Sequence, residues 1–321
     1  MKRFLTTVIG AVALAAVPLA PSNAQEFLTP PDVAWGMVLD PAKVRTSTLA
    51  SQVMDHFTVE QRDQLGEMID GVSNTLGLNL HEDLGKIVAF GDGFAPGDIS
   101  IAVDVGSAQT NVEGLLLALE NYDSYDYSNL IIHSVQSQDK PRFFCAILPG
   151  SETQSGVLLL SPDKTKTEEL VDQAKTGTQV INPDILGGED FFRLWVDRIP
   201  AELFEGSPQQ SNIAGMIQSL EIVGSTGELD TRLALNVTLT NPARARQIYQ
   251  MAAGGKALIE LAASNDADAA KLADLLAYVR VEQPADNSNL LSITALCDNE
   301  GLASVLDMLD EAGAFNELGL E

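Results

Sequence analysis

Residues 99–105 read Ile-Ser-Ile-Ala-Val-Asp-Val, and residues 233–239 read Leu-Ala-Leu-Asn-Val-Thr-Leu. In both stretches every second residue is a branched aliphatic, and the residues between are polar or small. Successive side chains of a β-strand point to opposite faces, so this alternation predicts strands of a sheet that is covered on one face. Strands of a parallel sheet covered on both faces would be apolar throughout. The two stretches therefore predict an antiparallel or mixed sheet.

Each predicted strand is followed by apolar residues at helical spacing. After the second strand, Asn241 is a typical helix cap and Pro242 a typical first helical residue. The helix that follows is expected from the periodic residues Ile248, Met251, Ala252, Gly255, Leu258, Ile259 and Ala262, and a shorter one after the first strand from Val112, Leu115, Leu116 and Leu119.

A pair of strands and a closing helix are then expected in both parts of the chain. The strand pairs are residues 129–135 with 142–148, and residues 277–283 with 289–297; the closing helices are residues 162–176 and 299–310. The order strand, helix, strand, strand, helix thus occurs twice. We predict an α+β fold of two related halves, each an antiparallel or mixed sheet with helices packed on one face. The expected boundaries are 25–176 and 177–321.

Another unit precedes the first half. Residues 33–39 and 86–90 are expected to be strands, and Thr58 with Gln61 matches the capping box of a helix that ends at Gly77. Residues 177–190 and 205–212 are rich in Gly, Pro, Asn, Gln and Ser and are expected to be loops around a strand at residues 191–199.

The first 24 residues have the three parts of a secretory signal peptide. Lys2 and Arg3 precede an apolar stretch at residues 4–20, and residues 22–24 (Ser-Asn-Ala) fit a cleavage site. The alternative is an uncleaved anchor, but Thr6, Thr7 and Pro18 interrupt a run that is already short for a bilayer. We expect cleavage after Ala24 and export to the periplasm or the extracellular space. Because no Cys follows the cut and no later run is long and apolar, we expect neither a lipid anchor nor a transmembrane segment in the mature chain.

The net charge excludes some classes of partner. The 321 residues carry a formal charge of −26, and removal of residues 1–24 takes away two bases and no acids, which leaves −28. Such a surface repels nucleic-acid phosphates and anionic membranes, and the chain has no basic cluster that would offset it. We therefore expect no nucleic-acid partner. The remaining candidates are an unidentified protein or a small ligand.

Three phrases of the sequence resemble a family of exported bacterial proteins of unknown function, a domain with repeated strand–helix units. They are residues 27–33 (Phe-Leu-Thr-Pro-Pro-Asp-Val), the segment from Leu76-Gly77-Leu78 through residues 83–87 (Asp-Leu-Gly-Lys-Ile), and residues 227–230 (Gly-Glu-Leu-Asp). The resemblance covers most of the mature chain. It implies a location in the envelope or outside the cell, and it implies no activity and no catalytic residues.

The two cysteines, Cys145 and Cys297, lie in strand-like stretches among apolar neighbours. Alternation places both side chains on apolar faces, so we expect two buried free thiols. Export would also permit a disulfide between them, which is the alternative.

Motifs for catalysis, metals and cofactors are absent from the sequence. His56, His81 and His133 share no metal-ligand spacing, and there is no G-x-S-x-G, H-E-x-x-H or phosphate-binding glycine loop. Asp266 and Asp268 alternate as in a calcium loop, but the glycine and distal glutamate of an EF-hand are missing, so Asp266 is better interpreted as a helix cap. We expect no cofactor and no metal.

The densest group of aromatic and acidic residues is the stretch from Tyr122 to Tyr127. It contains Tyr122, Asp123, Tyr125, Asp126 and Tyr127, and thus three of the five tyrosines. We interpret it as a helix–strand connection pinned by tyrosines; a loop that binds calcium, a sugar or a peptide is the alternative. If any surface is functional, this stretch is the predicted site.

Gly254 and Gly255 lie inside a predicted helix, where each costs ~1 kcal/mol relative to Ala. Close packing of the helix on the sheet is the expected reason, with a hinge as the alternative.

Three classes of function remain open. The favoured one is a non-enzymatic exported protein that binds another protein or a small ligand. The others are a hydrolase whose carboxylates meet only in the folded chain, and a carrier of an apolar ligand between sheet and helices.

Overall fold

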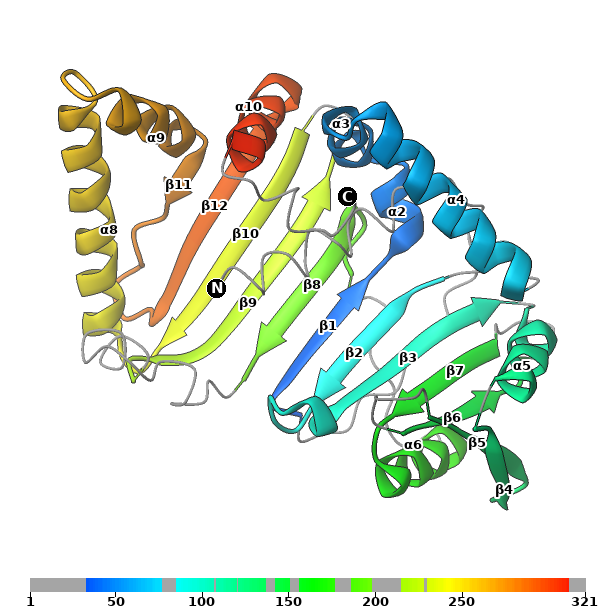
Figure 1. Ribbon diagram of the computed structural model, residues 1–321. Helices are drawn as coiled ribbons and strands as arrows, with labels where there is room; N and C mark the ends of the chain where they lie inside the picture. The colour runs from blue at the N-terminus through cyan, green and yellow to red at the C-terminus, as the bar shows by residue number, and fades with distance from the viewer. Residues whose placement is uncertain are drawn as a thin grey trace.

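The computed structural model describes residues 33–76, 85–106, 108–119, 121–136, 142–150, 156–176, 186–197, 215–227 and 230–311. These residues form one antiparallel sheet of twelve strands with helices around it (Figure 1). The predicted signal peptide, residues 1–24, and the residue His81 lie outside the described ranges. The α+β class and the antiparallel sheet are confirmed.

The strands follow the order β11-β12-β10-β9-β8-β1-β2-β3-β7-β6-β5-β4 across the sheet. Their bounds are β1 Trp35–Leu39, β2 Ile87–Gly91, β3 Ile99–Gly106, β4 Asp123–Tyr127, β5 Leu130–Val135, β6 Phe143–Leu148, β7 Gly156–Ser161, β8 Asp190–Val196, β9 Ile217–Thr226, β10 Asp230–Leu239, β11 Val279–Val281 and β12 Leu290–Asp298.

The helices are α2 Pro41–Arg45, α3 Thr48–His56, α4 Val59–Leu76, α5 Gln109–Ala118, α6 Lys164–Thr176, α8 Pro242–Ala262, α9 Ala267–Ala277 and α10 Asn299–Glu311, with a short 3₁₀ turn, η1, at Pro96–Asp98. Several sequence signals for their ends are confirmed. Thr58 and Gln61 exchange both bonds of a capping box, at 3.1 and 3.0 Å. The side chain of Asn241 accepts from the backbone N–H of Arg244 at 3.0 Å, and that of Asp266 from Ala269 at 3.2 Å.

A single sheet runs through both predicted halves of the chain, because β1 pairs with β8 at its centre. Counted outward from this pair, the strands follow the orders β1-β2-β3-β7 and β8-β9-β10-β12. In each series three strands come in chain order, and a strand from further along the chain then returns beside the third. The relationship between the halves, and the boundary at residue 176, stay predictions.

One face of the sheet is apolar across nearly its whole width, and we call it the apolar face. A cross-strand row on it, read from β11 to β4, consists of Val281, Ile293, Leu235, Ile222, Leu194, Met37, Ala89, Ile101, Leu160, Cys145, His133 and Ser124. The first ten members are apolar. A row of this kind requires the same register in every pair, since a slip by one residue would move a strand's apolar side chains to the other face.

The opposite face changes character along the sheet. Over β1 to β7 it is apolar, and α6 covers it through Leu170 and Val171, which pack with Val88, Leu159 and other residues of one core cluster. Helix α5 packs on the apolar face, in a cluster with alternate residues of β3 and β7. The expectation that the helices of each half lie on one face is therefore corrected for the first half. Alternation within β7 supplies both faces with aliphatic side chains.

Both cysteines are buried, as expected, in different clusters. Cys145 is in β6 and Cys297 in β12, eight strands apart in the sheet order. At roughly 4.8 Å per strand the separation is about 38 Å, whereas a disulfide needs Cα atoms within about 7 Å. Both thiols are free, and burial raises the pKa of Cys145 to about 11.

Candidate functional site

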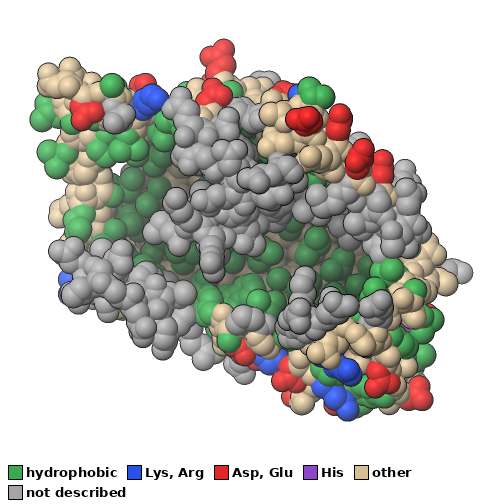
Figure 2. All heavy atoms as spheres, in the orientation of Figure 1, with side chains coloured by type: hydrophobic (Ala, Val, Ile, Leu, Met, Phe, Trp, Pro, Cys, Tyr) green, Lys and Arg blue, Asp and Glu red, His purple; other side chains and the backbone are tan. Residues whose placement is uncertain are grey.

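Apolar side chains are visible on the apolar face of the sheet. Figure 2 shows them recessed between α8 on one side and the helices α3, α4 and α5 on the other. Residues of the face that are only partly buried include Met37 on β1, Ile222 on β9 and Leu235 on β10. Partly exposed aliphatic residues on several neighbouring strands form the kind of surface that binds an apolar partner or ligand.

Among the described residues, Leu233 is the most exposed large apolar residue on the strands of this face. It lies on β10 with half of its surface exposed (50%), and Leu296 on β12 is exposed to the same extent (49%). Leu296 pairs with Arg232, the residue next to Leu233, and therefore points to the opposite face. The two leucines thus have equal exposure on opposite sides of the sheet.

Helix α2 packs on the apolar face and also carries a buried cation, Arg45. Val44 packs with Leu39, Phe192 and Leu194, which places α2 over β8 on this face. Arg45 follows Val44 and is only 9% exposed. Within the described ranges, its shielded Nε and Nη2 atoms donate no hydrogen bond. Burial lowers the pKa of Arg45 to about 10, and the nearby Asp40 carboxylate partly opposes this shift.

Two caps hold Arg45 at the junction between α2 and α3. The Asp40 carboxylate accepts from the backbone N–H of Lys43 at 3.2 Å and begins α2. The Ser47 hydroxyl accepts from Ala50 at 3.2 Å and begins α3. Lys43 points elsewhere, since its Nζ donates to the carbonyls of Gly187 and Asp190 at 3.1 and 2.8 Å. The two caps thus fix the backbone on both sides of Arg45.

A polar network lies on the opposite face over β8 to β12. The Arg193 Nε donates to the Glu221 carboxylate at 2.8 Å, and the Asn236 amide donates to its other oxygen at 3.0 Å. The Ser292 hydroxyl donates to Asn236 Oδ1 at 2.9 Å, so that the network joins four strands. Arg193 and Glu221 are about one third exposed (34% and 27%). Their mutual pairing satisfies the charges, which favours a structural role.

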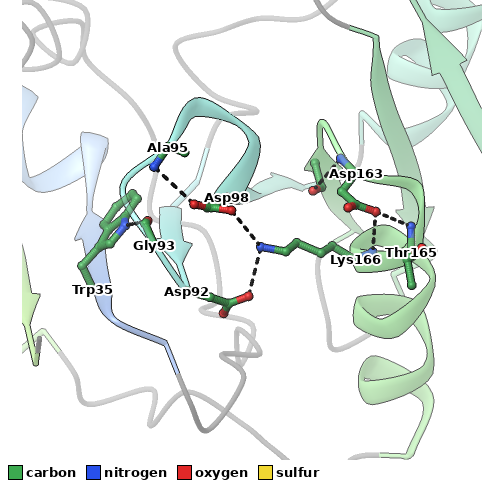
Figure 3. Close-up of polar contacts among 9 residues, drawn as sticks. Trp35, Asp92, Gly93, Ala95, Asp98, Asp163, Thr165 and Lys166 are labelled. Carbon is green, nitrogen blue, oxygen red and sulfur yellow. Dashed lines mark hydrogen bonds and ion pairs between the residues drawn. The ribbon is translucent and has the colours of Figure 1, made fainter. Parts of the chain in front are cut away.

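A second polar cluster joins α6 to the loop between β2 and β3 (Figure 3). The Lys166 Nζ lies 3.0 Å from Asp92 and 3.8 Å from Asp98, and Asp98 also accepts from the backbone N–H of Ala95 at 3.2 Å. On the far side of the loop, the Trp35 Nε1 donates to the carbonyl of Gly93 at 2.7 Å. These contacts fasten the loop at both sides. Because the charged side chains are paired with one another, we interpret the cluster as structural: it holds the loop between β2 and β3 against α6.

The predicted site from Tyr122 to Tyr127 is mostly a strand rather than a loop, because Asp123–Tyr127 form β4 at the edge of the sheet. The Lys164 Nζ lies 4.2 Å from the centre of the Tyr125 ring. The Tyr127 hydroxyl donates to the Asp172 carboxylate at 2.7 Å, and this bond raises the pKa of Tyr127 to about 12. Both tyrosines thus pin β4 to α6. Asp123 and Asp126 are exposed and point to opposite faces of the strand, since their positions differ in parity.

Tyr122 and His133 meet on the α5 side of the sheet. The Tyr122 hydroxyl lies 3.0 Å from the His133 Nδ1, and His133 is buried. Burial lowers the pKa of His133, and Glu113 opposes this effect. His56 ends α3, far along the chain from His133. Among the described residues, no group of three or more His, Cys, Asp and Glu side chains is placed to hold a metal ion.

The expected reason for Gly254 and Gly255 is wrong. A Cβ added at either position would meet nothing within 4 Å, so neither glycine allows a close approach to the sheet. The neighbouring helix positions Met251, Leu258 and Leu261 are 57%, 68% and 71% exposed. This side of α8 faces solvent, and the helical periodicity of apolar residues did not distinguish it from the packed side.

Sequence reasoning did not single out Arg45. A single arginine carries no motif, and only the tertiary structure shows that it is buried. The available signal was local: Asp40-Pro41 and Ser47 are strong helix-start residues, and a cation between two closely spaced helix starts has a restricted position.

Comparisons with known proteins identify no family. No family model matches the chain, and no curated protein matches it, so the family resemblance stays a prediction. Three crystal forms of TP0453, forms III, I and IV, are similar in structure, with TM-scores of 0.41, 0.39 and 0.42 and 9%, 9% and 8% identity. The similarity covers 92%, 92% and 87% of this chain and 98%, 97% and 96% of the other. At these values it supports no inference about function.

In the described part of the chain, no helix combines the length and the apolar character that crossing a bilayer requires.

Proposed function

We propose that the protein is an exported binding protein without catalytic function, and that it holds a small apolar ligand on the apolar face of its sheet. The observation that supports the proposal is the recess of Figure 2, in which apolar side chains of the sheet are visible between the flanking helices. Partial exposure of Met37, Ile222 and Leu235 leaves apolar surface for a ligand to cover. Each Å² of apolar surface removed from water contributes about 25 cal/mol.

The groups with shifted pKa values favour binding over hydrolysis. In the described chain the shifted pKa values belong to one guanidinium, one imidazole, two phenols and two thiols. A hydrolase based on carboxylates would instead need a pair of facing acids. The sheet also supplies a rigid floor, because eleven cross-strand pairings fix its register.

Binding of the neutral dye Nile red tests the proposal, since its fluorescence increases in an apolar environment. The dye should bind the purified protein, and Leu233→Gln should weaken binding by about tenfold, the effect of losing much of one buried leucine. Leu296→Gln is the matched control, with equal exposure on the opposite face, and should leave the affinity unchanged. Absence of binding by the wild-type protein, or equal effects of the two variants, would overturn the proposal.

A further inference from the structure

The solvent side of α8 carries a line of exposed residues at the spacing of a coiled coil. They follow one another at alternating steps of three and four residues, which keeps them on one side of an α-helix. All of them are exposed; the middle of the line consists of Met, Gly and Leu, and its ends are polar. We call this line the α8 seam: Arg244, Gln247, Met251, Gly254, Leu258 and Leu261 in the helix, and Asn265 in the turn that follows it.

The apolar part of the seam is left in water by the fold of a single chain. Ala245, Ile248 and Tyr249 hold the other side of α8 against the sheet. Figure 1 shows α8 along the outer border of the molecule, beside α9 and β11. Leu258 and Leu261 are the most exposed of the large apolar side chains in the described chain, at 68% and 71%, the former equalled by Val59. Monomeric proteins seldom expose apolar residues in such a contiguous line, and the seam therefore has the character of an interface.

The charged groups at the two ends of the seam have opposite sign. At its start the Arg244 guanidinium donates to the next seam residue, Gln247, at 2.8 Å and therefore lies along the seam. At its other end the exposed Asp266 directly follows Asn265. Two such seams complement each other when they are antiparallel, because each Arg244 then lies beside the Asp266 of the other copy. A parallel pair would bring like charges together and align the two helix dipoles.

The spacing of the seam fixes the register of an antiparallel pair. Gly254 is the middle one of the seven residues. A twofold axis at Gly254 places Met251 of each copy opposite Leu258 of the other, and Arg244 opposite the turn that holds Asn265 and Asp266. The same patch thus covers itself, as a twofold interface requires. Residues at alternating steps of three and four also pack well between two nearly antiparallel helices.

A membrane surface fits this helix less well. Amphipathic helices that lie on bilayers are rich in Lys and Arg on their polar face. Helix α8 has three bases, and two of them are engaged within the protein: Arg246 pairs with Asp286 at 3.2 Å, and the Lys256 Nζ donates to the carbonyls of Leu276 and Val279 at 2.6 and 3.1 Å. The formal charge of −26 also opposes binding to anionic lipids.

From these observations we propose that α8 is a dimerisation helix, through which two copies of the chain pair by their α8 seams, antiparallel and around a twofold axis near Gly254. The proposal goes beyond the proposed function and does not depend on it, because the seam lies on the side of α8 that is turned away from the sheet. The negative charge of each copy opposes the encounter, and one pair of helices makes a small interface. We therefore expect a weak dimer, with a Kd on the order of 10 µM at physiological ionic strength.

Sedimentation velocity measurements on the purified protein test the proposal. Wild-type protein should pass from monomer to dimer between about 1 and 200 µM. Leu258→Gln should raise the Kd about a hundredfold, because a symmetric dimer loses the leucine contact twice and each loss costs about tenfold. Val59→Gln is the matched control: Val59 begins α4, is also 68% exposed and should leave the Kd unchanged.

A second pair of variants tests the orientation of the helices. Arg244→Glu places an acid beside Asp266 of the other copy and should raise the Kd by about fivefold or more. Arg246→Glu changes the net charge equally and lies in the same turn of α8, but the Arg246 side chain pairs with Asp286 and is not part of the seam. The ratio of the two Kd values therefore separates pairing at the seam from general repulsion between acidic molecules.

Each outcome supports or overturns the proposal. A wild-type protein that remains monomeric at about 200 µM would overturn it, whatever else α8 binds. A dimer that survives Leu258→Gln as well as Val59→Gln would show that the copies meet elsewhere. Equal effects of Arg244→Glu and Arg246→Glu would exclude the antiparallel pairing. None of these results bears on the binding of Nile red, so this proposal and the proposed function can fail separately.

A further variant keeps the test decisive if Leu258→Gln fails to fold. Met251→Gln removes the side chain that lies opposite Leu258, and Met251 is 57% exposed in the single chain. Its matched control is Leu117→Gln on α5, where the leucine is 56% exposed. Met251→Gln should weaken the dimer, and Leu117→Gln should leave it unchanged; equal Kd values for these two variants would overturn the role of the seam.

Discussion

The indole ring of Trp195 lies across Gly36. The two residues are paired directly between β8 and β1, and a Cβ at Gly36 would overlap the six-membered part of the indole. Trp195 is also packed against the core cluster that α6 covers. This contact is at the centre of the sheet, where the strands of the two predicted halves meet. A side chain at residue 36 would therefore push apart the only strand pair that joins the two series in the described sheet.

We expect Gly36→Ala to lower the free energy of unfolding by about 1–3 kcal/mol, the usual cost of overpacking. Urea denaturation followed by tryptophan fluorescence measures the change. An unaltered midpoint would show that the indole can move aside without loss of packing.

Gly254→Ala should have the opposite effect. The glycine lies inside α8 with open space around the position of a Cβ, and Ala is a better helix former than Gly by about 1 kcal/mol. The same denaturation experiment should show a gain of about 0.5–1 kcal/mol. A loss of stability would indicate that α8 requires the glycine for a contact or a bend.

Thr58→Ala should cost about 1 kcal/mol of stability, because it removes the side-chain acceptor at the start of α4. Ser51→Ala is a suitable control: Ser51 is exposed inside α3, and its hydroxyl donates to the carbonyl of Thr48 in the same helix. We expect a change within about 0.5 kcal/mol for that control. Equal effects in thermal melts would argue against the capping box.

Stability should fall on mild acidification because of His133. Burial lowers its pKa in the folded protein below the ordinary value of 6.5, so the unfolded chain binds more protons as the pH falls below that value. The free energy of unfolding is therefore at its full value above pH 6.5, where His133 is neutral in both states. It decreases as the pH falls from 6.5 toward the pKa of His133 in the folded protein. Glu113 opposes the shift, and Tyr122 contacts the ring. Urea unfolding between pH 7.5 and 5.5 should give a shallower decline for His133→Gln than for wild type; parallel curves would contradict the assignment.

Calcium should leave the melting temperature unchanged. The acids of the predicted site, Asp123 and Asp126, point to opposite faces of β4, while Tyr125 and Tyr127 contact α6. A ligand that binds only the folded state must raise the melting temperature. A rise in a calcium titration, lost in Asp126→Asn, would restore the alternative of a binding site in this stretch.

Local patterns predicted most of the strands and helices but not the shape of the site. Alternation in β3 and β10 and the caps at Thr58, Asn241 and Asp266 all identified elements that the structure contains. Strand β4 was interpreted as a connection because its turn is made by Ser128 and Asn129, with φ of 54° and 61°, instead of the more familiar Asn-Gly. Both residues adopt left-handed backbone conformations, which are uncommon for residues other than glycine and are hard to predict from residue type.

Strand β9 was missed for a different reason. Gly224 interrupts its apolar side, and the structure shows why: a Cβ there would meet the ring of Phe191 at 2.9 Å. The polar side of β9 includes Glu221, whose partners Arg193 and Asn236 come from β8 and β10. Such pairs, like the burial of Arg45, depend on which strands become neighbours, and this information is not present in any single stretch of sequence.

The two ends of the twelve-stranded sheet have a consequence for self-assembly. Outermost strands expose unpaired backbone groups that can recruit further strands and start fibrous aggregates. One border, β4, has the exposed carboxylates of Asp123 and Asp126, and the other, β11, is three residues long with Arg280 exposed. A second copy that paired its own β4 with this border would bring carboxylates together and desolvate them. At the other border, β11 has only three residues with which an added strand could form hydrogen bonds. Both borders of this wide sheet therefore disfavour edge-to-edge association between copies of the protein.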